Sequence, residues 1–142
     1  MLSFIWPIAL VVFSNVIYHI SAKSAPKELN PLASLTVTYL IASLTSGILF
    51  FILNHGGNLL REYQKLNRTP FILGIVVVGL EAGFLYAYKA GWEVSKASLV
   101  QSTFLAVALL FAGRLFYGEE LTWNKLLGAA VCLIGLAIIN YR

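Results

Sequence analysis

Charged residues are scarce in this chain, and cysteine is nearly absent. Only 11% of its 142 residues are Asp, Glu, Lys or Arg, whereas 59% are hydrophobic. Soluble domains carry about 25% charged residues, so this composition excludes an ordinary soluble protein. The net charge of +4 comes from scattered residues without a basic run, which excludes a typical nucleic-acid-binding surface. The single cysteine, Cys132, excludes an internal disulfide and a cysteine-based metal site.

Motifs of known catalytic centres are also missing. The chain has no His-Glu-x-x-His zinc motif and no serine nucleophile elbow. Its two histidines, His19 and His55, are far apart in the sequence. We therefore expect a protein that is not an enzyme and that uses neither a cofactor nor a metal ion, although membrane helices can assemble a site without any local motif.

Five apolar stretches make up most of the sequence. Each is long enough to cross a bilayer core of about 30 Å as a helix, and residues such as Pro, Gly and Asn separate them. The predicted helices cover residues 2–22, 32–53, 71–88, 97–117 and 126–141. The fold class is therefore all-α, a polytopic membrane protein with one domain over 1–142. Only the connection at 54–69 is long, and the spacing of apolar and charged residues at 58–67 predicts a short amphipathic helix on the membrane surface.

Positive charges near the helix ends do not decide the orientation in the membrane. Lys and Arg favour the cytoplasmic side, but the predicted spans divide them equally. The side of the N-terminus has Arg61, Lys65, Arg68, Arg114 and Lys125, and the other side has Lys23, Lys27, Lys89, Lys96 and Arg142. Two interpretations stay open. Either the long second connection places the N-terminus inside, or the chain inserts both ways and pairs with an inverted copy of itself.

An acidic residue stands near the centre of the third predicted span. At about 1.5 Å per residue, Glu81 lies about 16 Å along the helix from Pro70, halfway through the apolar core. A carboxylate there costs roughly 2.5 to 3.5 kcal/mol, so it must be neutral, paired or in a wet cavity. Desolvation favours the neutral acid, whereas water or a cation favours the ionised form. Glu81 is thus a candidate proton or ion carrier; the alternative is an acid that stays neutral and hydrogen-bonded.

Further polar side chains are candidates for lining a transport path. Asn15, Tyr18 and His19 share one face of the first predicted helix, at spacings i, i+3 and i+4. Their alternative roles are helix–helix hydrogen bonding and, for His19, a place at the membrane interface. Tyr88 lies seven residues after Glu81 on the same helix face. It would either close a cavity or belong to the aromatic belt at the interface.

The other spans contribute a few more candidates. Tyr39 in the second span is large enough to reach a cavity, whereas the small hydroxyl side chains around it are expected to serve helix packing. Gln101, near the start of the fourth span, is a weaker candidate that is expected to point inward. In the last span Gly128, Cys132 and Gly135 form a smooth side that a second helix can approach closely, so we expect a dimer interface there.

The second half of the chain resembles a known transporter family. It contains Gly-Phe-Leu-Tyr-Ala-Tyr-Lys-Ala-Gly-Trp-Glu-Val-Ser-Lys-Ala-Ser-Leu-Val at 83–100 and Gly-Glu-Glu-Leu-Thr-Trp-Asn-Lys-Leu-Leu-Gly-Ala-Ala-Val-Cys-Leu-Ile-Gly at 118–135. Together with the five predicted helices, these segments resemble one EamA-like unit of the drug/metabolite transporter superfamily. The Gly-Glu-x-Leu-Thr turn before the last helix is the most specific part.

The resemblance implies a function class, a dimer and a location. EamA-like transporters usually carry two such units related by an inverted pseudo-twofold axis. A single unit implies a homodimer, parallel or antiparallel, or a heterodimer with a related subunit, in the inner (plasma) membrane of a bacterium or archaeon. The implied function is secondary transport of a small metabolite or drug-like molecule, with Glu81 as the candidate coupling residue. The alternatives are a subunit of a flippase for a lipid-linked metabolite without proton coupling, and an accessory membrane protein that transports nothing.

Two departures limit what the resemblance implies about the site. The four-helix small multidrug resistance proteins, which are related, carry an essential glutamate eight residues before a lysine in the first helix, but here Asn15 stands eight residues before Lys23. Many EamA-like units also have a Glu-Pro pair in the fourth helix, where this chain has Leu105 and Ala106. Antiport of cationic drugs by that mechanism is therefore in doubt, and cations, amino acids and neutral metabolites all remain open as substrates.

Overall fold

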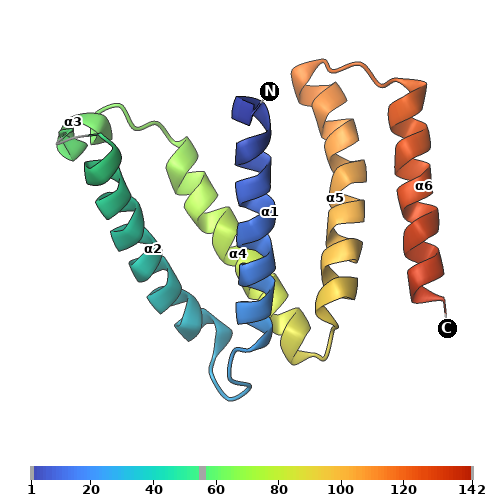
Figure 1. Ribbon diagram of the computed structural model, residues 1–142, viewed down its shortest axis with the longest axis horizontal. Coiled ribbons are helices and arrows are strands. Elements are labelled where there is room, and N and C mark those ends of the chain that lie inside the picture. The colour runs from blue at the N-terminus through green and yellow to red at the C-terminus, as the bar shows by residue number, and fades with distance from the viewer. Residues whose placement is uncertain (1, 55–56, 142) are drawn as a thin grey trace. The chain divides into compact units, whose positions relative to one another are not determined.

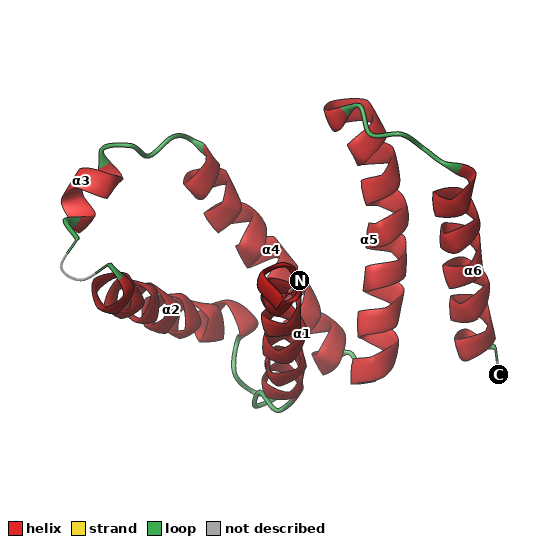
Figure 2. Cartoon of the chain, turned by 45° about the horizontal axis from the view of Figure 1, so that its top comes forward, coloured by secondary structure: helices red, strands yellow, loops and turns green. Residues whose placement is uncertain are grey.

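The structure is a computed structural model that describes residues 2–54 and 57–141, and it is almost entirely helical (Figure 1). The long helices are α1 (Leu2–Lys23), α2 (Pro31–Leu53), α4 (Thr69–Lys89), α5 (Val94–Tyr117) and α6 (Trp123–Asn140), and the short one is α3 (Leu59–Tyr63). Figure 2 shows no strand in the described part of the chain. Each long helix contains a span long and apolar enough to cross a membrane. The predicted fold class, an all-α membrane protein with five spans, is confirmed.

Helix α1 starts at the predicted residue and the other four long helices start earlier than predicted, whereas all five ends agree within one residue. The predicted starts exclude Pro31 and Pro70, but both prolines lie in the first turn of their helices. Proline is tolerated there because the first N–H groups of a helix have no acceptor within the helix. Helices α5 and α6 start three residues earlier than predicted, directly after the extended residues Glu93 and Thr122.

The chain divides into two compact units, Met1–Ala90 and Gly91–Arg142. In the first unit, α4 contacts both α1 and α2. The second unit is a hairpin in which α5 contacts α6. The prediction that the whole chain forms one domain stays a prediction.

Helix α4 is at the centre of the first unit. Its residues Ala82 and Leu85 form a small apolar core with Leu35 of α2, which is 3% exposed. The buried residues described in this unit are Pro31, Leu35, Ala82, Leu85 and Tyr88. All of them lie in the first turns of α2 or the last turns of α4. The tight packing of this unit is therefore at the end where α1 connects to α2.

Large apolar side chains are exposed on all the spanning helices. Examples are Phe13, Leu40, Ile75, Phe116 and Ile138. In water, apolar surface on this scale promotes association and aggregation. In a bilayer the lipid chains solvate it, while the helices satisfy their own backbone hydrogen bonds. The exposed surface is therefore that of an integral, multi-pass membrane protein.

The Gly-Glu-x-Leu-Thr turn closes the hairpin of the second unit. Helix α5 ends at Tyr117, and the next residue, Gly118, has a left-handed φ of 66° that favours glycine. The Glu119 N–H donates to the Gly113 carbonyl at 3.1 Å. The Glu119 carboxyl lies against Gly113, where an added Cβ would come within 2.9 Å of Oε2, and Lys125 Nζ lies 3.7 Å from that oxygen. These contacts give the turn a structural role.

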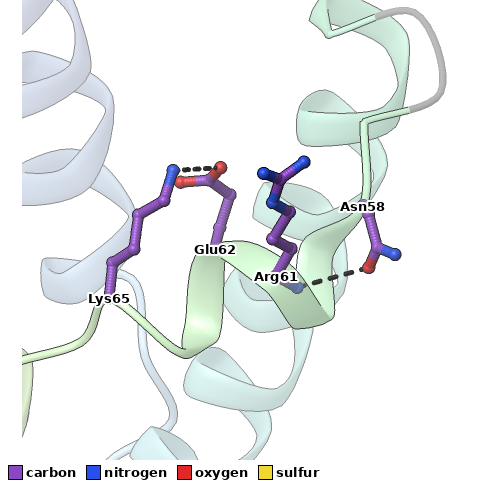
Figure 3. A network of polar contacts seen from close by, with 4 residues as sticks. All are labelled: Asn58, Arg61, Glu62 and Lys65. Atoms are coloured by element: carbon purple, nitrogen blue, oxygen red, sulfur yellow. Dashed lines mark hydrogen bonds and ion pairs between the residues drawn. The ribbon is translucent and has the colours of Figure 1, made fainter.

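The connection between α2 and α4 contains the predicted short helix, α3. The Asn58 side chain accepts a hydrogen bond from the Arg61 N–H at 3.3 Å, and Lys65 forms an ion pair of 2.7 Å with Glu62 (Figure 3). The helix itself is confirmed, although it is shorter than the predicted segment at 58–67. Its placement on the membrane surface stays a prediction.

Candidate functional site

A cavity of about 320 Å³ lies in the first unit, among α1, α2, α4 and the α1–α2 connection. It is lined by Tyr18, Ser21, Ala22, Ala25, Pro26, Ser34, Leu35, Thr38, Glu81 and Leu85. The polar side chains of this lining are four hydroxyl-bearing residues and one acid, with no Lys, Arg or His among them. A cavity of this size is at the lower end of the range for small-molecule sites.

Glu81 is half-buried in the cavity wall, close to two tyrosines of other helices. The hydroxyls of Tyr18 in α1 and Tyr39 in α2 are near enough to interact electrostatically with its carboxyl. Nevertheless, Glu81 Oε2 and both hydroxyl oxygens are buried without meeting hydrogen-bond geometry to any described residue. Buried polar atoms normally have a partner. Two hydroxyl oxygens, one from α1 and one from α2, therefore lie near the α4 carboxyl with hydrogen-bonding capacity to spare.

His19 and Tyr88 link α1 directly to α4. The Tyr88 hydroxyl and His19 Nδ1 are 2.8 Å apart, and Tyr88 is 5% exposed. Phe84 packs edge-to-face on His19 with ring centroids 4.7 Å apart, and Lys23 Nζ lies 5.6 Å from the centroid of the Tyr88 ring. Such burial is unlike that of a lipid-facing belt tyrosine. Neither His19 nor Tyr88 is in the cavity lining, so a direct role in transport stays a prediction for both.

The remaining candidates are not in the cavity lining. Asn15 is exposed on α1, and Gln101 is half-buried in α5 of the second unit. On α6, Gly128 and Cys132 are exposed and Gly135 is half-buried. An added Cβ at either glycine would meet nothing within 4 Å, so packing inside the chain does not require glycine there. The roles predicted for these five residues stay predictions.

Three hydroxyl residues of the lining were not among the predicted site residues. Ser34 and Thr38 are four residues apart on α2, a spacing that places them on one helix face. The Thr38 hydroxyl donates to the Ser34 carbonyl at 3.1 Å, as expected for a hydroxyl that serves its own helix. Ser21 lies near the end of α1. Helical spacing shows that Ser34 and Thr38 share a helix face, but it does not show which face of the helix meets a neighbouring helix.

A lysine at the end of α4 binds the connection between α1 and α2. Lys89 Nζ donates to the carbonyl oxygen of Lys27 at 2.6 Å and to that of Leu29. The same connection contributes Ala25 and Pro26 to the cavity lining. Because both acceptors are backbone atoms, no pattern of side chains predicts this contact.

The described residues include no group of three or more His, Cys, Asp or Glu side chains that could hold a metal ion.

Residues 2–141 match the family model of the EamA-like transporter family. No curated protein and no solved structure matches the chain. The family match covers nearly the whole sequence and agrees with the resemblance noted at 83–100 and 118–135.

Proposed function

Since the chain belongs to the EamA-like transporter family, we propose that it is a subunit of a secondary transporter for a small metabolite or drug-like molecule, with Glu81 as the carrier of a coupling proton. The observation that carries this proposal is the position of Glu81. Its carboxyl lines a cavity between spanning helices, and the hydroxyls of Tyr18 and Tyr39 from two other helices lie close to it.

The chemistry of coupling follows from the surroundings of this acid. Among apolar helices the neutral form of Glu81 is favoured, and entry of water or a cation favours the anion. The hydroxyls of Tyr18 and Tyr39, which lie near the carboxyl, can donate hydrogen bonds to that anion. Proton release and substrate entry would then occur at the same group, so that one depends on the other.

The residues that line the cavity also limit which charge the substrate can carry. A phosphorylated or carboxylated anion would meet a carboxyl and hydroxyl groups but no Lys, Arg or His among the lining residues. Anion sites in proteins normally supply such a cation. The proposed substrate is therefore an uncharged or positively charged molecule of modest size.

Transport assays with several classes of compound test the proposal. Proteoliposomes that contain a pH-sensitive dye would be exposed in turn to mixtures of amino acids, organic cations and neutral metabolites. We expect one mixture to change the internal pH at a rate that protein-free liposomes do not show. A flippase would instead move a fluorescent lipid analogue without a pH change. An accessory protein would do neither, and crosslinking in the native membrane would join it to a larger protein.

A dimer is part of the proposal, because a single five-helix unit needs a second unit to surround a central site. Replacing Gly128 and Gly135 together by leucine is expected to convert dimers to monomers, since the larger side chains keep two α6 helices apart. The fold of the chain itself should persist, because neither site has atoms within 4 Å of an added Cβ. Light scattering in detergent and crosslinking in membranes measure the change.

The matched control for this experiment is on α4. Gly74 and Gly79 also have nothing within 4 Å of an added Cβ, and their replacement by leucine should leave the dimer intact. A monomeric parent protein would contradict the dimer. Equal dissociation of both double variants would contradict an interface on α6.

A further inference from the structure

Near one end of the cavity, hydrogen bonds from a lysine ammonium join α4 to the α1–α2 connection. Lys89 is the last residue of α4, and its ammonium donates to the carbonyls of Lys27 and Leu29, 62 and 60 residues away in the sequence. Hydrogen bonds from an ionised donor are stronger than those between neutral groups. The two acceptors lie in the non-helical segment that joins α1 to α2. One side chain therefore fastens this segment to α4.

The fastened segment is also a wall of the cavity. Ala25 and Pro26 belong to it, and the flanking helix ends contribute Ser21 on one side and Ser34 on the other. The segment has its own turn, in which the Leu29 N–H donates to the Pro26 carbonyl at 3.2 Å. Moving this turn away from α4 would change one end of the cavity while leaving the helices in place.

Other contacts at this end join α4 to its neighbouring helices, and Ala25 of the turn packs against the apolar core. The hydrogen bond of 2.8 Å between Tyr88 and His19 joins α4 to α1, and the core of Leu35, Ala82 and Leu85 joins α4 to α2. Among the described residues, both hydrogen-bond acceptors of the Lys89 ammonium are in the turn. The contact is exposed, so water can compete for the same carbonyls. Such a contact can break and form again without unfolding the unit.

From this placement we propose that Lys89 is a positioning residue that keeps the α1–α2 turn closed over one end of the Glu81 cavity, and that its release opens that end to water. The inference deepens the proposed function and rests on it for its meaning in transport. A transporter must open its site to one side of the membrane at a time. Lys89, by binding the main-chain carbonyls of the α1–α2 turn, provides such a gate at one end of the cavity.

Thiol labelling in lipid nanodiscs, where both membrane faces meet water, tests the gate without any substrate. Ser34→Cys in a Cys132→Ser background places one thiol in the cavity wall, and a charged methanethiosulfonate reagent reports its access to water. Lys89→Met should raise the labelling rate about tenfold, the factor expected when a charged hydrogen bond is lost. Lys89→Arg keeps a cationic donor and should stay near the parent rate. Mass spectrometry follows the modified fraction with time.

Two controls separate opening from other effects. Lys27→Met removes a neighbouring ammonium but keeps the backbone carbonyl that Lys89 uses, so its labelling rate should match the parent. Ala82→Cys places the thiol in the core instead, at a position that is 8% exposed and outside the cavity lining, and should stay unlabelled in the Lys89→Met protein. Unchanged labelling of Ser34→Cys in Lys89→Met, equal acceleration by Lys27→Met, or labelling at position 82 would each overturn the proposal. Because the labelling needs no substrate, a result that contradicts the role of Lys89 can be distinguished from a result that contradicts the proposed transport function.

Discussion

Replacing Glu81 by glutamine is expected to abolish substrate-driven proton movement in proteoliposomes, with a fall of at least about a hundredfold, as is usual when an essential proton-transfer group is lost. Glutamine has the size of glutamate and can hydrogen-bond, but it cannot ionise. The cavity and the packing around Leu85 should therefore be preserved. The measurement is the rate of dye-reported pH change with the compound class that the parent protein transports.

The matched control for this result is Glu120→Gln. Glu120 is an exposed acid in the α5–α6 turn, outside the spanning segments, and its replacement removes the same kind of charge without changing the cavity lining. Flux should persist in that variant. Persistent proton flux in Glu81→Gln would assign coupling to another group. If Glu81→Gln still moved substrate but no longer moved protons, the cavity would be the transport site and Glu81 its coupling residue.

Replacing Leu35 by alanine is expected to destabilise the first unit by about 2 to 5 kcal/mol, the range for emptying a well-packed apolar site. Leu35 is 3% exposed and fills the contact between α2 and α4 with Ala82 and Leu85. The loss should appear as a lower midpoint of thermal unfolding, followed by circular dichroism in detergent. The same substitution at Leu40, which is on the same helix and 62% exposed, should have little effect. Equal shifts for the two variants would show that the α2–α4 contact does not support the unit.

The membrane spans and the choice of Glu81 as a candidate site residue could be predicted from the sequence, because both depend only on neighbouring residues in the chain. A run of apolar residues fixes the length of a membrane helix, and an acid within such a run is costly wherever it points. Glu81 and Tyr18 line one cavity, and their roles in transport stay predictions. The starts of α2 and α4 were predicted too late, because proline acts as a helix breaker only beyond the first turn.

The partners of the candidate residues could not be predicted. His19 and Tyr88 were separate candidates, and their hydrogen bond depends on which face of α1 meets α4. The contribution of Ser34 to the cavity depends in the same way on the rotation of α2. Because apolar residues surround all sides of these helices, the hydrophobic pattern that reveals the inner face of a soluble helix is weak here. The hydrogen bonds of Lys89 are still harder to predict from the sequence, since their acceptors are main-chain carbonyls.

Those main-chain acceptors also determine how the contact tolerates sequence variation. Every amino acid at positions 27 and 29 presents a carbonyl oxygen, so exchanging side chains there leaves the acceptors of Lys89 in place. The number of residues in the turn matters more than their identity. Inserting or deleting a single residue between Pro26 and Asn30 would shift both oxygens away from the ammonium, whereas point mutations in the same stretch would be tolerated.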